Sequence, residues 1–484
     1  MNFALLQTPS GSGFGWILPA LIFFGVLGLV LAPTFIEMRK HHPAGLRVLF
    51  FVEMWERFSY YGMRALLLLY MTADAAHGGL GWGLGKASLI YGTYTMSVYA
   101  FGLPGGWIAD RFIGYRKAVF VGGLFIALGQ FALVFKAVPF FFGGLLLIII
   151  GTGLLKTNST TLVGQLYPLG DARRDGGFSI YYVGINLGAF ISPLICGWFA
   201  QDPAFMKMLS GMGLATNSGW HWGFAAGGVA MIAGLIQYAL QQDKLGNAGI
   251  KTGAQEEAEE RHSEKTPLTP EEWKRLAVVM ILFVFSTLFW AVYEQAGSTL
   301  NIFADQHVRT SILGFSFPST WYQSVNSFFI FLLAPLFAWA WVRLHAKGKE
   351  PSSPAKFAVG VFLVGAGMAF LIPVSKLIDA HGTMAGPYWL IGVYFLHTVG
   401  ELCLSPVGLS LTSKLAPPKI AGMVMGLWFW SMALGNFLAG VAASLFIHMT
   451  LTQAFELIFA VMTVATVVLI ALTPSIKKLM GGVH

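Results

Sequence analysis

The chain has 484 residues, of which 56% are hydrophobic and only 11% charged, with a net charge of +8 and a mean hydropathy of +0.67. Soluble proteins carry about 25% charged residues, so this chain has too few polar side chains to cover a water-facing surface. The composition excludes a soluble multidomain protein, a coiled coil and a nucleic-acid-binding domain. It predicts an all-α polytopic protein of the cell membrane.

The predicted elements are apolar runs, because a helix needs about 20 such residues to cross a bilayer. The first run, at 14–36, has no basic residue before it, whereas a signal peptide begins with a basic region. We therefore expect an extra N-terminal transmembrane helix. Twelve further spans are expected at 46–72, 86–108, 117–136, 139–167, 176–200, 220–240, 276–299, 320–344, 356–378, 386–412, 421–447 and 452–473, which makes 13 in all.

The basic residues predict the orientation of these spans. If residues 37–45 are cytoplasmic, the cytoplasmic segments hold 22 of the 30 lysines and arginines and the opposite side holds 5. Cytoplasmic loops of membrane proteins carry this excess. We therefore expect the N-terminus outside and the C-terminus inside, and the basic charge needs no nucleic-acid partner.

Residues 241–275 are polar and charged, which indicates a cytoplasmic linker. Near its end, Thr269-Pro270-Glu271-Glu272 combines an N-cap, a proline at the first helical position and a Glu at N3. Two six-helix halves around a central cavity are the plan of the major facilitator fold. The expected domains are 1–45 (extra helix and basic segment), 46–240 (first bundle), 241–275 (linker), 276–474 (second bundle) and 475–484 (cytoplasmic tail).

Seven ionisable residues fall inside the expected spans, where each costs roughly 2.5–3.5 kcal/mol unless paired or hydrated. Such groups are retained mostly for function. The four that lie in the span 46–72 share one helix face with Tyr60 and Tyr61 at 3.6-residue spacing. That face should line water or a cavity. The seven are Glu53, Glu56, Arg57, Arg64, Lys156, Glu294 and Glu401.

The depth of these charges suggests how they pair. At about 1.5 Å per residue, Arg64 and Glu294 both lie in the outer half of the membrane, whereas Lys156 and Glu401 lie in the inner half. Each pair joins one bundle to the other. We therefore predict two alternating ionic gates, Arg64–Glu294 outside and Lys156–Glu401 inside.

The balance of charge suggests a coupling ion. Four carboxylates face three bases, and Glu53 and Glu56 are neighbours at i,i+3, so their mutual repulsion and burial favour protonation of one of them. We assign proton coupling to Glu53, Glu56, Arg57 and Glu294. No cofactor other than protons is expected. The sequence shows no clustered metal ligands, no nucleotide-binding loop and no nucleophile with a base, so we expect neither a metal site nor an enzyme.

Three motifs then match a known set. Glu53–Gly62 (EMWERFSYYG), Gly105–Gly114 (GGWIADRFIG) and Phe178–Gly188 (FSIYYVGINLG) resemble the signatures of the proton-dependent oligopeptide transporters. Gly151–Lys156 (GTGLLK) and Glu401 with Ser405-Pro406 also agree, and the resemblance covers about residues 46–474. It departs at Thr157, where the family usually has Pro, and in the short linker, where many bacterial members carry two further helices.

The resemblance implies proton-driven import of di- and tripeptides by alternating access, by a monomer in membrane lipid. It further implies that Arg57 and Lys156 hold the peptide carboxylate, that Glu401 holds the amino terminus, and that Asn186 and Asn326 hydrogen-bond the peptide backbone. Six aromatic residues would shape the side-chain pockets: Tyr60, Tyr61, Tyr99, Tyr182, Trp290 and Trp428.

Other functions stay open on the same fold. The cargo could be nitrate, a peptide-like drug or another small anion, and the chain could instead be a channel or a non-transporting peptide receptor. Glu401 discriminates among the cargoes, because a pure anion has no ammonium group to pair with it.

Overall fold

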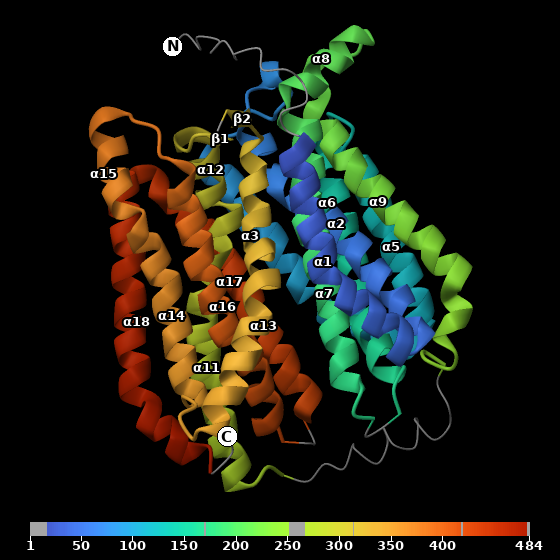
Figure 1. Cartoon of the computed structure of the whole chain (residues 1–484), viewed down its shortest axis with the longest axis vertical. Coiled ribbons are helices and arrows are strands. Elements are labelled where there is room, and N and C mark those ends of the chain that lie inside the picture. Colours follow the sequence, from blue (N-terminus) through green and yellow to red (C-terminus); the bar gives the residue numbers. More distant parts are fainter. Residues whose placement is uncertain (1–16, 169–170, 251–266, 313, 418–419, 482–484) are drawn as a thin grey trace.

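The computed structural model describes residues 17–168, 171–250, 267–312, 314–417 and 420–481 (Figure 1). It is built almost entirely of helices, with one short antiparallel pair of strands, β1 (Ser311–Ile312) and β2 (Phe315–Ser316), at one end. Nine helical stretches among the described residues are long and apolar enough to cross a membrane. The chain is therefore a helical multi-pass membrane protein.

The first part of the chain holds the helices α1 (Ile17–His41), α2 (Ala44–Thr72), α3 (Leu84–Ala100), α4 (Gly102–Ile108), α5 (Tyr115–Ala132), α6 (Val138–Gln165), α7 (Arg174–Gln201), α8 (Pro203–Gly211) and α9 (Gly219–Gln241). The second part holds α11 (Pro270–Tyr293), α12 (Thr299–His307), α13 (Ser324–Ala346), α14 (Ser353–Phe370), α15 (Ile372–His381), α16 (Pro387–Leu415), α17 (Ala421–Leu445) and α18 (Leu451–Leu479).

Two expected spans are each divided into two helices. The run at 86–108 breaks between α3 and α4, three residues before Pro104, and the run at 356–378 breaks between α14 and α15, just before Pro373. Proline has no backbone N–H and cannot complete the hydrogen bond to the preceding turn. The breaks therefore have a local cause that the apolar pattern alone does not show.

The capping motif at Thr269–Glu272 starts a helix, as the sequence predicts. The Thr269 hydroxyl accepts a hydrogen bond from the Glu272 backbone N–H, and the Glu272 carboxylate accepts one from the Thr269 backbone N–H. These reciprocal bonds satisfy backbone donors that the first turn of α11 leaves free. Helix α11 thus begins at Pro270, within the stretch 241–275 that the sequence analysis expected to be linker.

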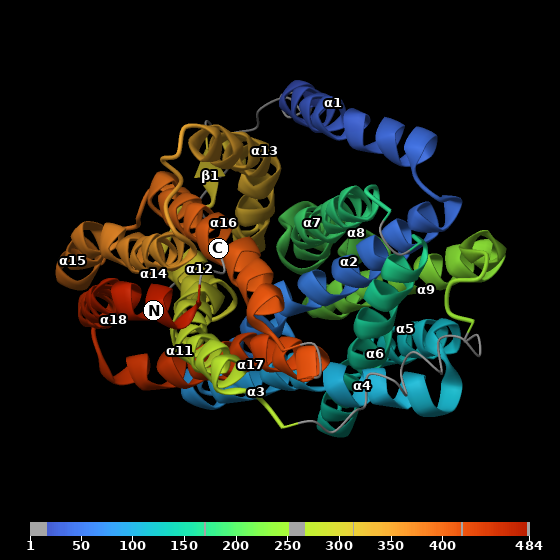
Figure 2. The ribbon, with the colours of Figure 1, turned by 90° about the horizontal axis from the view of Figure 1, so that it is seen from below.

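The hydrophobic cores follow two groups of helices, which the view from below separates clearly (Figure 2). One core contains only residues between Val278 and Met480. The other two consist almost wholly of residues up to Ala248. Helix α1 lies at the edge of the first group, where Phe35 packs edge-on against Phe50 of α2 with ring centroids 5.6 Å apart.

The two groups meet most closely along α3 and α17. A Cβ at Gly92 would lie 2.8 Å from the Cα of Gly440, so only glycine permits this contact. The hydrogen bonds found between described residues of the two groups, by contrast, lie near the end of the molecule where α2 and α7 finish and α13 begins. The cavity described next lies between the two groups, below that end.

Candidate functional site

A cavity of about 190 Å³ lies between the two groups of helices. Its walls come from α2, α3, α6 and α7 on one side and from α11, α13, α16 and α17 on the other. Nine of the predicted ligand-binding residues line it: Arg57, Tyr61, Tyr99, Lys156, Tyr182, Asn186, Trp290, Asn326 and Glu401. The polar face predicted on α2 therefore does border a cavity.

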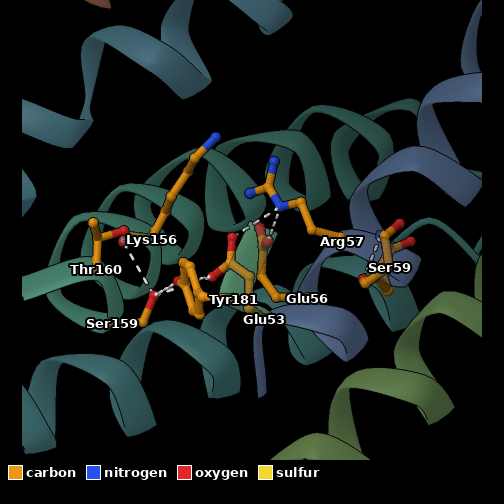
Figure 3. Close-up of polar contacts among 9 residues, drawn as sticks. Glu53, Glu56, Arg57, Ser59, Lys156, Ser159, Thr160 and Tyr181 are labelled. Atoms are coloured by element: carbon orange, nitrogen blue, oxygen red, sulfur yellow. Dashed lines mark hydrogen bonds and ion pairs between the residues drawn. The ribbon is translucent and has the colours of Figure 1, made fainter. Parts of the chain in front are cut away.

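The α2 motif forms a buried ionic cluster (Figure 3). The Arg57 guanidinium forms ion pairs with both carboxylates of its helix, Glu56 and Glu53, and its Nε lies 3.4 Å from Glu53 Oε1. All three side chains are at most 1% exposed. Because Arg57 is shared by two acids, its positive charge is already balanced, and Glu53 and Glu56 lie behind it and not in the cavity wall.

Lys156 on α6 has a different environment. Its ammonium lies 5.0 Å from the ring centroid of Tyr99, a cation–π contact. No ion pair to Lys156 is found among the described residues. Helix α6 runs unbroken through Thr157, whose hydroxyl donates to the Gly102 carbonyl at 3.1 Å where α3 gives way to α4. Lys156 therefore presents to the cavity an ammonium group that has no ion pair with a described residue.

Glu401 on α16 lies in the opposite wall and is held by neutral donors. Its Oε2 accepts hydrogen bonds from the Tyr293 hydroxyl at 2.6 Å and from Asn326 Nδ2 at 3.2 Å. Asn326 in turn donates to Thr398 Oγ1 at 2.9 Å. Within the described part of the chain Glu401 has no cationic partner, so its negative charge is available to a ligand.

Arg64 and Glu294 form the ion pair that their depth predicts, and both residues line the cavity. The Arg64 Nε also donates to the Tyr91 hydroxyl at 2.6 Å. Both charged side chains are less than 10% exposed. The predicted second pair is not formed: in the portion of the chain described, Lys156 and Glu401 both line the cavity without an ion pair between them.

Two predicted aromatic residues do not belong to the cavity wall. Tyr60 is 1% exposed and packs beneath Arg57, with the guanidinium carbon 5.1 Å from its ring centroid. Trp428 is 3% exposed and packs on Phe357 and Gly408 inside the second bundle. The resemblance to the transporter family assigned both residues to the side-chain pockets, but the rotation of their helices turns both away from the cavity.

The sequence analysis also missed residues that do line the cavity, above all Tyr293 and His397. Tyr293 lies one turn after Trp290 on α11, and that spacing would have identified it. His397 lies one turn before Glu401; it is buried, bonds the Val364 carbonyl at 3.1 Å and stacks on Tyr293. Together these residues orient the wall that carries Glu401.

Comparisons with known proteins place the chain in a family. The model of the POT family matches residues 116–252 and 250–464. The peptide transporter YePEPT of Yersinia enterocolitica is 36% identical, covering 91% of this chain and 96% of that protein. A di-/tripeptide transporter of Lactococcus lactis subsp. cremoris is 30% identical, covering 91% and 97%.

Solved structures of POT transporters resemble the fold of this chain. A POT peptide transporter in complex with alafosfalin superimposes with a TM-score of 0.81 at 36% identity, covering 92% of this chain and 97% of that one. A POT family transporter in complex with 5-aminolevulinic acid gives a TM-score of 0.79 at 30% identity, covering 90% and 97%. The alignment with YePEPT extends over 507 positions, more than the 484 residues of this chain, so that relative has segments that are absent here. The chain belongs to the POT family of transporters.

Proposed function

We propose that the protein imports di- and tripeptides together with protons, by alternating access across the inner or plasma membrane of the cell. The observation that carries this proposal is the pair of unbalanced charges in the cavity. Lys156 from the first group of helices and Glu401 from the second lack ion-pair partners among the described residues, and both line the cavity. A peptide has one carboxylate and one ammonium group, which complement these two charges.

The rest of the wall fits a peptide of variable sequence. Asn186 and Asn326 offer amide groups to the peptide backbone, while Tyr61, Tyr182 and Trp290 offer aromatic surface. Aromatic faces accept different side chains through contact area instead of through specific hydrogen bonds. The names of the relatives from Yersinia and Lactococcus support the same cargo.

The orientation follows from the distribution of basic residues along the sequence. We propose 13 spans with the N-terminus outside, so that the end closed by Arg64 and Glu294 faces outward. The structure then represents a state closed toward the outside, and the pairing of Lys156 with Glu401 belongs to the opposite state. Since one chain supplies every residue of the cavity, we propose that a monomer is sufficient for transport.

A second cargo is a small zwitterion other than a peptide. It is favoured by the POT relative whose structure holds 5-aminolevulinic acid, at 30% identity. The same two charges, Lys156 and Glu401, would hold the two ends of such a molecule. It would leave Asn186 without a peptide backbone to bind, so its affinity should depend less on this residue.

Transport in liposomes tests these proposals. Counterflow of a labelled dipeptide should be observed without a pH gradient, and concentrative uptake should appear only with an inward proton gradient. Competition by the same dipeptide with an acetylated amino terminus should be weak. Counterflow without any response to the gradient would contradict proton coupling, and stronger competition by 5-aminolevulinic acid than by dipeptides would favour the second cargo.

A further inference from the structure

The amide group of Asn326, on α13, is held by two side chains of α16. Its Nδ2 donates to Thr398 Oγ1 at 2.9 Å and to Glu401 Oε2 at 3.2 Å. An amide nitrogen carries two hydrogens, so both are used by these two contacts. The amide oxygen, Oδ1, accepts no hydrogen bond from a described residue, and Asn326 lines the cavity. Asn326 therefore has only an acceptor left to offer a ligand.

Thr398 determines which way round this amide lies. Its side chain is fully buried, and its hydroxyl donates its single hydrogen to the Tyr394 carbonyl at 2.6 Å, one helical turn earlier. The hydroxyl can then only accept a hydrogen bond from Asn326. An ionised Glu401 can also only accept. A reversed amide would place Oδ1 against two acceptors, so Nδ2 faces α16 and Oδ1 does not.

The carboxylate of Glu401 is oriented in the same sense. The two hydrogen bonds that it receives, from Tyr293 and Asn326, both go to Oε2. The Tyr293 ring stacks on both Phe289 and His397, with centroid distances of 5.6 and 6.1 Å, which restricts its movement. Oε1 accepts no hydrogen bond from a described residue. The free oxygen of Glu401 is thus a second acceptor beside the amide oxygen of Asn326.

From this geometry we infer that Thr398 is a positioning residue. By fixing the Asn326 amide, it makes Asn326 and Glu401 present two hydrogen-bond acceptors and no donor, so this wall selects the end of a ligand that carries N–H groups. The inference rests on the proposed peptide cargo and names the chemical groups that the wall recognises. A ligand acceptor placed there would find no donor and would lose its hydrogen bond to water. The N–H at Asn326 Oδ1 belongs either to the ammonium group or to the peptide bond.

The experiment measures the binding of three compounds to the purified protein in liposomes. The first is a dipeptide. The second is its ester analogue, in which oxygen replaces the peptide N–H. The third is the same dipeptide with a trimethylated amino terminus, which keeps the positive charge but has no N–H there. At least one analogue should bind roughly twofold to tenfold more weakly than the dipeptide, and that analogue identifies the N–H at Asn326 Oδ1.

Thr398→Val keeps the shape of the side chain but removes the acceptor, so one Nδ2 hydrogen of Asn326 loses its partner and the amide can turn it toward the cavity. The KM for dipeptide counterflow should rise roughly twofold to tenfold with the maximal rate unchanged, and the preference for the dipeptide over that analogue should shrink by a similar factor. Thr398→Ser keeps the hydroxyl and should restore both. Thr412→Val is the matched control, because Thr412 is also buried on α16 and its hydroxyl has no partner among the described residues.

A reduced preference in Thr398→Val that Thr398→Ser restores and Thr412→Val lacks would support the inference. An unchanged preference in Thr398→Val, or an equal change in Thr412→Val, would overturn it while leaving peptide import intact. Equal binding of all three compounds to the unaltered protein would also overturn it, and this result does not depend on the folding of any variant. If the unaltered protein does not bind the dipeptide at all, the proposed cargo fails and the inference fails with it.

Discussion

The two ends of the central cavity differ in how the halves of the molecule are joined. At the end where α2 and α7 finish, Arg64 pairs with Glu294, Asn301 Nδ2 donates to the Ala65 carbonyl at 2.9 Å, and Thr320 Oγ1 donates to Gln201 Oε1 at 3.0 Å. At the opposite end the described residues show no hydrogen bond or ion pair between the halves. Separating a buried, hydrogen-bonded seam leaves donors and acceptors without partners, which costs free energy. Separating the apolar contact of Leu103 with Gly426 leaves no polar group without a partner.

The comparison explains why Lys156 and Glu401 are unpaired. In a rocking transporter, one seam opens when the other closes around a fixed site. In the proposed orientation the seam that contains Arg64 and Glu294 is the outer one, and the charges predicted to form the inner gate line the cavity without an ion pair between them. Four substitutions test this difference between the two ends.

The largest effect is expected from removing one member of the outer ion pair. Arg64→Ala leaves Glu294 buried without its partner, which costs about 3–5 kcal/mol in similar pairs. We expect proton-driven uptake to fall to background and the thermal unfolding temperature to drop. Arg64→Ala combined with Glu294→Ala should recover stability but not uptake. A loss of stability in the double variant equal to the sum of the losses in Arg64→Ala and Glu294→Ala would show that the pair has no coupling.

A large effect on the ligand is expected at Glu401. Glu401→Gln keeps the volume and the hydrogen bonds of the side chain but removes the charge that we assign to the peptide ammonium. A hydrogen bond to a charged group contributes about 1.5–3 kcal/mol, so dipeptide affinity measured by competition should fall roughly tenfold to a hundredfold. The acetylated dipeptide should lose little. If both peptides weaken equally, Glu401 does not bind the amino terminus.

A smaller effect is expected from the neutral part of the outer seam. Gln201 bonds Asp305, Ser319 and Thr320 across the two halves. Gln201→Ala removes these bonds without leaving a buried charge, and each is worth about 0.5–1.5 kcal/mol. The population open toward the outside should rise, measured by the labelling rate of a cysteine placed at Asn186 in the cavity. Gln241→Ala, at the opposite end, is the control and should leave this rate unchanged.

The smallest effect on transport is expected at Trp428. Because its ring packs on Phe357 inside the second bundle and not in the cavity wall, Trp428→Phe should lower thermal stability slightly and leave dipeptide affinity unchanged. Trp290→Phe, in the cavity wall, is the matched comparison and should weaken binding. A drop in dipeptide affinity for Trp428→Phe would show that Trp428 does shape a side-chain pocket, as the resemblance implies.

Much of the candidate site was predictable, because charges within apolar spans are rare and their depth follows from counting residues along a helix. That reasoning placed Arg64 opposite Glu294, and it put Arg57, Lys156 and Glu401 on one cavity. The motif resemblance added the aromatic and amide residues. The rotation of each helix was less predictable, since a spanning helix that packs on all sides shows little periodicity; this is why Tyr60 and Trp428 were assigned to the wall and Tyr293 was not.

Hydropathy, capping and burial of charge are local properties, so the sequence alone establishes that this chain crosses a membrane repeatedly, where helix α11 begins and which charges the membrane must accommodate. The surroundings of most of these charges follow from the tertiary structure. Arg57 is balanced by Glu53 and Glu56, Glu401 is held by Tyr293, and Lys156 has no acid partner among the described residues. The Arg57 cluster lies within one helix, whereas the surroundings of Glu401 and Lys156 depend on how helices distant in sequence are rotated against each other, which no single helix encodes.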